Sequence, residues 1–407
     1  MNPPGDRSDR VSDRVSGGLL DGKPARVVLV GAHGHGRIHR QNLQRLEPKG
    51  IARLAGVCDL RPLAEAGLDG AAPDRNVPFS PSLPDLIELV DPDIVLVATP
   101  IHTHLDLTLT AARAGRAVLL EKPPTATLAQ FHELAGGVAA TGVPCQIGFQ
   151  SLGSDAIAGA LRLIADGAIG AVTGIGGAGT WVRDTAYFSR AGWAGKRRLG
   201  DLAVTDGALT NPFGHLVATA LALADADGVD DVREVELELF HGYHVESDDT
   251  ATARIRTAAG VPITLAVTLC ASRHRLPFVM VHGTHGCLTL RYTRDLLTLD
   301  TADGRTPYQF ERTDLLSDLV ARLRDPGHEL LVPPQRAGGF MQVLEAVRVA
   351  ADPQPIPAEF VQVSGPASNP RHAVRGIDQI VLSTARTLRT FAEQDVPWAR
   401  TAAGSLR

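Results

Sequence analysis

The sequence of 407 residues is poor in lysine, and aromatic residues make up only 4% of it. Of its 40 basic residues, only four are lysines, namely Lys23, Lys49, Lys122 and Lys196. Arginine stays protonated in proteins, so any reaction that needs an amine able to lose its proton has to use one of these four side chains.

Other absences each exclude a class of protein. The longest apolar runs, such as Ile94–Ala98, are too short to cross a bilayer, so we expect no membrane partner. A formal net charge of -5 argues against a nucleic-acid partner, because proteins that bind nucleic acids usually carry a basic face. The four cysteines show no metal-ligand spacing, and residues 1–24 contain no apolar signal segment. We therefore predict reduced thiols in a cytoplasmic protein and a disordered tail over residues 1–24.

Strand patterns and helical patterns alternate through the first part of the sequence. The expected strands are Arg26–Val30, Leu54–Cys58, Ile94–Ala98, Ala117–Leu120 and Val143–Gln150. Continuous apolar strands joined by helices are typical of a parallel sheet that is covered on both faces. We predict an α/β fold with a doubly wound Rossmann domain over residues 25–150, and its ligand should bind beyond the carboxyl ends of the strands.

The second part of the sequence has a different order. Strand-like runs such as Thr250–Arg256 and Pro262–Thr268 follow one another, and one helical stretch lies among them, from about Asn211 to Ala224. This order indicates a mainly antiparallel sheet with a helix packed on it. We predict an α+β domain over residues 151–400 that serves substrate binding and oligomerisation, so the chain should contain two domains.

The loop after the first strand resembles a phosphate-binding glycine loop. It has glycine at the first and last positions of the pattern G-x-G-x-x-G but histidine at the middle one. The helix that follows can still offer its N-terminal amides to a pyrophosphate. We predict that the cofactor contacts Gly31, His33, Gly34, His35 and Gly36.

The histidines of this loop raise the question of a metal. No carboxylate or cysteine joins His33, His35 and His39 at ligand spacing in the sequence, so we expect no metal site here. Asp59 ends the second strand, where an acid accepts hydrogen bonds from the adenosine ribose and favours NAD. Arg61 could pair with a 2'-phosphate, so NADP remains possible.

Several short motifs occur in a fixed order along the chain. They are Thr99-Pro100 followed by His104, Glu121-Lys122-Pro123, Gly148-Phe149-Gln150, and the run from Gly207 to His215. Over about Arg26 to Tyr292 the chain thereby resembles the Gfo/Idh/MocA oxidoreductases, relatives of glucose-fructose oxidoreductase and inositol dehydrogenase. The resemblance implies an NAD(P)-dependent dehydrogenase or reductase that acts on a secondary alcohol or ketone of a sugar, cyclitol or related polyol.

The resemblance also implies which residues meet the cofactor. These are Thr99, Pro100, His104, Glu121, Lys122 and Gln150. In this family the peptide bond between the lysine and the proline is often cis. Members often pair through the open face of the second domain's sheet, which implies a homo-oligomer.

Lys122 is the predicted general acid/base. Oxidation of an alcohol requires a base for the hydroxyl proton, and burial can lower a lysine pKa far enough for this task. The alternative is a structural ion pair with Glu121 at the domain edge.

His215 and Asn211 are the other predicted catalytic residues. If Asn211 caps a helix that starts at Pro212, His215 lies in the first turn, where the helix dipole favours neutral imidazole. A neutral His215 can bind the reacting hydroxyl or relay its proton, although it could also be a packed helix residue. Asn211 stands where the family usually has Asp, so it can orient a partner but carries no charge, and it could be a helix cap alone.

The segment from Trp181 to Arg198 is rich in arginine, glycine and aromatic residues. Polyols are held by aromatic faces and charge-assisted hydrogen bonds. We predict substrate contacts from Trp181, Arg183, Tyr187, Trp193 and Lys196, and the alternative is a solvated loop or a subunit contact.

Two other functions remain open. Asn211 and His33 favour a non-catalytic dinucleotide-binding regulator or sensor, whereas Lys122 and His215 favour an enzyme. A hydrolase or epimerase that uses bound NAD transiently would show no net change in free NADH.

Overall fold

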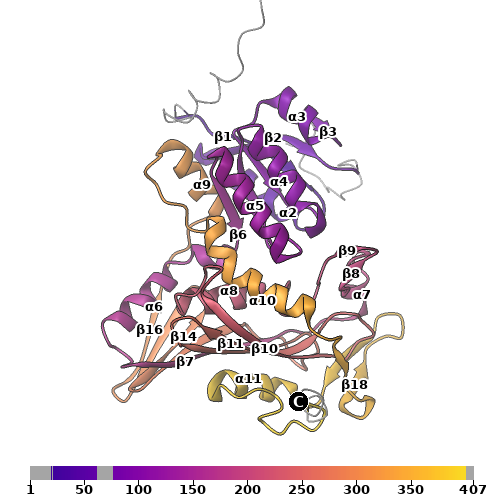
Figure 1. Cartoon of the computed structure of the whole chain (residues 1–407), viewed down its shortest axis with the longest axis vertical. Helices are drawn as coiled ribbons and strands as arrows, with labels where there is room; N and C mark the ends of the chain where they lie inside the picture. The colour runs from indigo at the N-terminus through magenta and orange to yellow at the C-terminus, as the bar shows by residue number, and fades with distance from the viewer. Residues whose placement is uncertain (1–19, 21, 62–76, 400–407) are drawn as a thin grey trace, which may run out of the picture. The chain divides into compact units, whose positions relative to one another are not determined.

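The computed structural model describes residue 20, residues 22–61 and residues 77–399 of the chain. The tail predicted over 1–24 lies almost entirely outside these residues. The chain divides into two compact units (Figure 1). The first unit comprises Met1–Thr125, Ala129–Gly148 and Thr313–Pro334. The second comprises Ala126–Leu128, Phe149–Arg312 and Gln335–Arg407.

The first unit contains a six-stranded parallel sheet within the described residues. In pairing order the strands are β3 (Phe79–Ser80), β2 (Ala52–Cys58), β1 (Ala25–Val30), β4 (Ile94–Val97), β5 (Ala117–Glu121) and β6 (Cys145–Gly148). Every residue of β4, β5 and β6 is buried, because helices cover both faces. The predicted doubly wound parallel sheet is confirmed.

Within the described residues, four helices connect these strands, namely α2 (Gly36–Leu46), α3 (Leu83–Val90), α4 (His104–Arg113) and α5 (Leu128–Thr141), with short 3-10 turns at η1 (Glu47–Lys49) and η4 (Ile101–Thr103). Helix α9 (Leu315–Arg324) also lies in this unit. Ser82 caps α3 by accepting a hydrogen bond from the Asp85 amide.

Helix α9 belongs to the first unit, although it falls within residues 151–400, the range predicted for the second domain. Gln146 on β6 donates a hydrogen bond of 2.5 Å to Asp318 on α9, and the Ile147 amide donates to the Val332 carbonyl at 2.8 Å. The residues 313–334 therefore return to the parallel sheet (Figure 1).

The second unit contains a nine-stranded mixed sheet within the described residues. In pairing order the strands are β16 (Gly304–Gln309), β15 (Leu296–Thr301), β14 (Gly286–Arg291), β13 (Phe278–Gly283), β7 (Val172–Thr180), β12 (Pro262–Thr268), β11 (Thr250–Thr257), β10 (Val232–His241) and β17 (Gln354–Pro355). Most neighbours are antiparallel, but β7 with β12 and β10 with β17 are parallel. The predicted α+β class is confirmed.

Helices and smaller pieces complete this unit. The helices are α6 (Asp155–Ala165), α7 (Thr185–Phe188), α8 (Gly214–Leu223), α10 (Gly338–Val349) and α11 (Ile377–Thr387), with 3-10 turns η5 (Gln150–Gly153), η6 (Pro334–Ala337) and η7 (Ala358–Phe360). Two small hairpins pair β8 (Arg198–Leu199) with β9 (Leu202–Ala203) and β18 (Val361–Ser364) with β19 (Arg371–Val374).

Glycines in β7 allow helices to approach both faces of this sheet. A Cβ atom at Gly176 would lie 1.9 Å from the Ala385 carbonyl oxygen of α11, and one at Gly179 would lie 2.3 Å from the ring of Phe213. Successive side chains of a strand point to opposite faces. Accordingly, α11 covers one face and α8 with α10 lies on the other (Figure 1).

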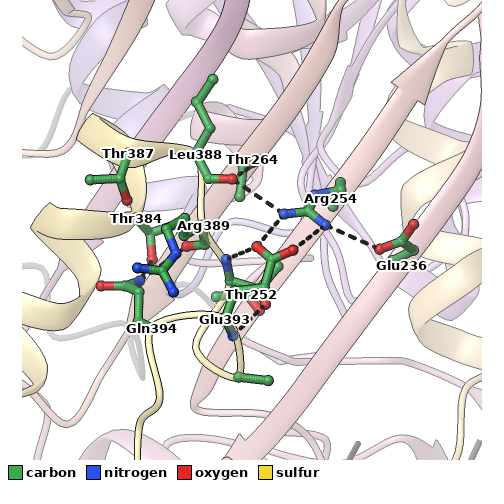
Figure 2. Close-up of polar contacts among 12 residues, drawn as sticks. Glu236, Thr252, Arg254, Thr264, Thr384, Thr387, Leu388, Arg389, Glu393 and Gln394 are labelled. Atoms are coloured by element: carbon green, nitrogen blue, oxygen red, sulfur yellow. Dashed lines mark hydrogen bonds and ion pairs between the residues drawn. The ribbon is translucent and has the colours of Figure 1, made fainter.

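The segment after α11 is anchored to the sheet by charged side chains. Helix α11 ends at Thr387, because Leu388 takes a left-handed conformation with φ 56°. Arg254 then donates to the Leu388 carbonyl at 3.2 Å and pairs with Glu393 at 2.5 Å (Figure 2). Helix α11 itself packs on β7 and β12.

The cysteines and the apolar character of the helices bear on two smaller expectations. Cys58, Cys145, Cys270 and Cys287 are free thiols, the first three of them buried. Burial raises the pKa of the Cys58 thiol to about 11 and that of Cys145 to about 12, so these thiols stay protonated. No helix among the described residues has the length and apolar character that a membrane span requires.

Candidate functional site

The glycine loop turns tightly between β1 and α2. Gly31 has φ 85°, and a Cβ atom there would lie 2.8 Å from the Ala98 carbonyl oxygen. A Cβ atom at Gly36 would lie 1.9 Å from the Gly31 carbonyl oxygen. Both positions therefore require glycine. Gly34 takes the left-handed conformation at φ 53° with open space around it, so the turn is displaced by one residue from the usual middle glycine.

This loop provides donors that suit a pyrophosphate. In the part of the chain that the structure describes, the amides of His33, Gly34 and His35 donate to no protein acceptor. They precede the first turn of α2, where the helix dipole also favours an anion. The donor set fits the phosphates of a dinucleotide.

Asp59 stands at the end of β2 and holds the same loop. One carboxylate oxygen accepts from the Ala32 amide at 2.8 Å, and the other accepts from the Arg61 amide at 3.0 Å. The His33 Nε2 atom lies 3.9 Å from the Asp59 carboxylate and 3.4 Å from the Arg61 carbonyl oxygen. The structure thus brings Asp59 and Arg61, predicted to meet the adenosine part of the cofactor, together with His33 of the predicted phosphate-binding loop.

His104 connects the ends of two strands. Its Nε2 atom lies 2.8 Å from the Thr99 carbonyl oxygen, and its Nδ1 atom lies 2.9 Å from the Pro123 carbonyl oxygen. The side chain is 1% exposed, and burial lowers the pKa of the imidazole. His104 therefore joins the Thr99-Pro100 turn after β4 to the turn after β5, and we propose a positioning role for it.

The Glu121-Lys122-Pro123 turn is held from two sides. The Glu121 Oε1 atom lies 2.8 Å from His39 Nε2 and 3.4 Å from His35 Nε2, while Oε2 accepts from the Lys122 amide at 3.1 Å. The Lys122–Pro123 peptide bond is cis, as the resemblance implied. Burial by itself would raise the pKa of the Glu121 carboxyl. Hydrogen bonds from the two imidazoles outweigh this effect, so the pKa of Glu121 lies well below its usual range.

The histidine cluster corrects one expectation. A carboxylate does join His35 and His39, because Glu121 approaches from a strand end 82 residues beyond His39. The three ligand atoms lie within 4.8 Å of one another, a spacing that sequence separation could not reveal. Two imidazoles and a carboxylate can ligate zinc, but here the short contact between His39 and Glu121 is a charge-assisted hydrogen bond that orients Glu121.

In the second unit, the run from Gly207 to His215 folds around Asp248, which the sequence analysis did not single out. A Cβ atom at Gly207 would lie 1.9 Å from an Asp248 carboxylate oxygen. The Leu209 amide donates to the other oxygen at 3.3 Å, and the Ala208 amide donates to the Asp248 carbonyl at 2.8 Å. Burial raises the pKa of Asp248 to about 6 despite these donors.

Helix α8 begins later than predicted. Its N-cap is Phe213, so the prediction that Asn211 caps the helix and Pro212 starts it is wrong. The Asn211 amide donates to Gly207 and the Phe213 amide to Ala208, so these residues form turns before the helix. His215 still lies in the first turn, with Nδ1 3.4 Å from the Ser151 hydroxyl.

Asn211 is hydrogen-bonded to a carboxylate that the sequence analysis missed. Its Nδ2 atom donates to Asp206 at 2.6 Å. The other Asp206 oxygen accepts from Arg190 at 3.0 Å and from the Gly195 amide at 2.8 Å. Residue 211 itself carries no charge, but the carboxylate of Asp206 is hydrogen-bonded directly to it.

The predicted substrate segment packs as a cluster of arginines and aromatic rings. The Arg183 guanidinium lies 4.8 Å from the ring of Trp181 and 4.9 Å from that of Tyr187. The Arg190 guanidinium lies 3.9 Å from Tyr187 and 4.7 Å from Trp193. We call these five residues the arginine–aromatic cluster.

Two predicted site residues lie outside these clusters. Among the contacts of the described residues, none joins the Lys196 side chain to the arginine–aromatic cluster. Gln150 begins η5, and its carbonyl accepts from Arg312 at 3.2 Å.

Two family models match the chain. Residues 25–149 match an oxidoreductase family described as an NAD-binding Rossmann fold, and residues 157–289 match the GFO/IDH/MocA C-terminal domain. The first match lies almost entirely within the first unit, and the second match lies within the second unit.

Curated relatives support the same assignment. The chain is 30% identical over 257 residues to levoglucosan dehydrogenase of Pseudarthrobacter phenanthrenivorans, covering 57% of this chain and 65% of that protein. It is 40% identical over 84 residues to scyllo-inositol 2-dehydrogenase (NAD(+)) of Bacillus subtilis, covering 20% of this chain and 25% of that protein. These matches span less than two thirds of either relative.

The fold is also shared with a solved structure. The WlbA dehydrogenase from Bordetella pertussis, solved with NADH and UDP-GlcNAcA, superposes with a TM-score of 0.64 at 22% identity, over 80% of this chain and 95% of that one. Together the two family matches span more than half of the sequence, and the chain belongs to the GFO/IDH/MocA oxidoreductase family, with an NAD-binding Rossmann domain in its first unit.

Proposed function

We propose that this protein is an NAD-dependent dehydrogenase or reductase acting on a secondary alcohol or ketone of a sugar, cyclitol or related polyol. The observation that carries the proposal is the ordered turn at the end of β5. Glu121 is fixed by His39 and by the Lys122 amide, and Pro123 is joined to Thr99 through His104. A partly buried lysine thereby stands on an ordered turn whose Glu121 contacts His35 of the phosphate-binding loop at 3.4 Å.

The residues of the chain have separate tasks in this proposal. NAD, when bound, accepts or supplies the hydride. The loop amides of His33, Gly34 and His35 bind its phosphates. Lys122 takes the hydroxyl proton during oxidation and returns it to the carbonyl oxygen during reduction.

The second unit supplies groups that hold the substrate. We propose that His215 binds the reacting hydroxyl or relays its proton and that Asn211, oriented by Asp206, accepts a hydrogen bond from it. The names of the curated relatives, which include levoglucosan and inositol dehydrogenases, support a sugar or cyclitol as substrate.

Lys122 offers the decisive test. A panel of inositols, sugars and sugar nucleotides should be screened for NADH absorbance with NAD and NADP separately, and Lys122→Ala should lower kcat by about 10²- to 10⁴-fold. Lys122→Arg keeps the charge but cannot release the proton, so it should be nearly as inactive. The exposed Lys49→Arg is the matched control and should be fully active. Full turnover by Lys122→Arg would refute the assignment.

A regulator of the same fold is the second candidate. Asn211 favours it because this position lacks the family's usual carboxylate, while Asp206 weakens that argument by placing a carboxylate 2.6 Å away. A regulator would bind NADH in a fluorescence titration and show no turnover with any member of the panel.

A further inference from the structure

Two buried N–H groups lie together in the arginine–aromatic cluster. The indole Nε1 of Trp181 and the guanidinium Nε of Arg183 are both buried, and neither has an acceptor among the described residues. Buried donors in folded proteins are nearly always hydrogen-bonded, so exceptions call for an explanation. These two belong to side chains in cation–π contact, which places the unsatisfied donors on neighbouring groups.

In the described parts of the chain, no acid forms an ion pair with the Arg183 guanidinium. Among the described residues its guanidinium donates to the neutral Val182 carbonyl at 3.1 Å and lies 4.9 Å from the Tyr187 ring. Arg190, on the other side of the Tyr187 ring, differs because it pairs with Asp206 at 3.0 Å. Among the described residues, Arg190 pairs with an acid and Arg183 does not.

The remaining groups around Arg183 do not supply the missing charge. The nearest acid in sequence, Asp184, accepts from Asn369 at 2.9 Å and caps α7 through the Tyr187 amide. His274 stacks on Trp181 at 5.7 Å, and burial together with the Arg183 charge lowers the pKa of its imidazole. The site therefore combines aromatic faces, two unsatisfied donors and one uncompensated positive charge.

We infer that the substrate carries an anionic group, a carboxylate or a phosphate, which binds Arg183 and the indole N–H of Trp181. A guanidinium binds such groups through charge-assisted hydrogen bonds, and the flanking rings hold its plane in place. This inference rests on the proposed function, because it names the class of sugar derivative that the site selects.

Tryptophan fluorescence of the full chain with NADH present provides a direct binding test. The probes are D-glucuronate, D-glucose 6-phosphate and neutral D-glucose, titrated at fixed ionic strength. We expect at least one anionic probe to bind ten- to a hundred-fold more tightly than glucose. Preference for glucuronate would identify a carboxylate, and preference for the phosphate ester would identify a phosphate.

Three variants locate the effect. Arg183→Gln should abolish the preference for the anion, and Trp181→Phe, which keeps a ring but loses the N–H, should weaken it several-fold. Arg198→Gln is the matched control, because Arg198 lies in the same segment but is exposed and contacts Asp201. It should bind the probes as the unmodified protein does. Thermal unfolding verifies that each variant is folded.

The outcomes separate this inference from the proposed function. If NADH binds and a neutral polyol is turned over equally well by Arg183→Gln and the unmodified protein, the inference fails and the function stands. If anionic probes bind through Arg183 but no probe is ever oxidised or reduced, the function fails and the anion site stands. Equal affinity for glucose and both anions would overturn the inference directly.

Discussion

The side-chain amide of Asn211 donates a hydrogen bond of 2.6 Å to the carboxylate of Asp206. The pair places an acid beside residue 211, where the family resemblance implies that an Asp is usual. Asp206 is buried and also accepts from Arg190 and the Gly195 amide, so its orientation is fixed.

This relationship predicts that restoring the usual acid at residue 211 is harmful. Asn211→Asp would put two carboxylates within hydrogen-bond distance, so one would have to keep its proton or the fold would lose roughly 1 to 3 kcal/mol. We expect lower kcat at pH 7 and partial recovery near pH 5. The exchange Asp206→Asn with Asn211→Asp should recover activity at pH 7. A pH–rate profile of the single and double variants measures this, and an Asn211→Asp enzyme with unchanged activity at pH 7 would contradict the pairing.

The glycine loop predicts a contrast between two alanine substitutions. Gly36→Ala would place a methyl group 1.9 Å from the Gly31 carbonyl oxygen, so the loop or the helix has to move. We expect NADH affinity to fall at least 100-fold. Gly34→Ala meets no atom within 4 Å and costs only the left-handed backbone, about 1 kcal/mol. NADH fluorescence titration compares the two, and equal affinities would show that the loop does not contact the cofactor as proposed.

The first unit was the more predictable part of the fold. Its central strands are buried on both faces, so each is a continuous apolar run that can be recognised in the sequence. Strand β16 has no such apolar run, because Gly304–Gln309 is largely exposed and contains a proline. The assignment of α9 to the first unit depends on contacts such as Gln146 with Asp318, which are 172 residues apart.

The site was predictable where backbone geometry demands a residue type and less so elsewhere. Gly31 and Gly36 are required by close backbone contacts, so a local pattern revealed them. Asp206 and Asp248 act through hydrogen bonds to segments that the fold brings near, and single acids in loops carry no recognisable spacing. The same reason explains why Glu121 was not foreseen as the partner of His35 and His39.

Glu121 predicts a dependence of stability on pH. Its pKa is held below the ordinary value of about 4.5 by His35 and His39, so its stabilising effect is present above that pH and is lost as the pH falls through the lowered pKa. Glu121→Gln should therefore unfold at a lower temperature than the unmodified protein at pH 7. The difference should shrink toward pH 3. Thermal unfolding across this range measures it, and a difference that does not change with pH would mean that the charge of Glu121 contributes nothing.

The raised pKa of Asp248 predicts that stability changes with pH in the opposite direction. Burial raises its pKa to about 6, so the folded state holds the proton more tightly than the unfolded state and stability falls as the pH rises from about 4 to 6. The size of this effect is up to about 3 kcal/mol. Asp248→Asn is neutral at every pH and should flatten the profile. Urea unfolding at pH 4.5 and 7.5 tests this, with the exposed Asp352→Asn as control. Identical slopes in Asp248→Asn and the unmodified protein would assign the pH dependence to other groups.

The anchoring of the C-terminal segment predicts a contrast along β10. The Glu238 carboxylate accepts from the Thr390 hydroxyl at 2.7 Å and from the Phe391 amide at 2.9 Å, so Glu238→Ala removes two acceptors at once. We expect a loss of about 2 to 4 kcal/mol in the free energy of unfolding, because donors that lose a charged acceptor are costly. Two residues earlier, Glu236 forms only surface ion pairs with Arg254 and Arg256 within the described chain, and Glu236→Ala should cost less than about 1 kcal/mol. Urea unfolding of both variants gives the comparison. If the two substitutions lower the free energy of unfolding equally, Glu238 does not hold the segment after α11. That segment would then stay on the sheet through apolar packing alone.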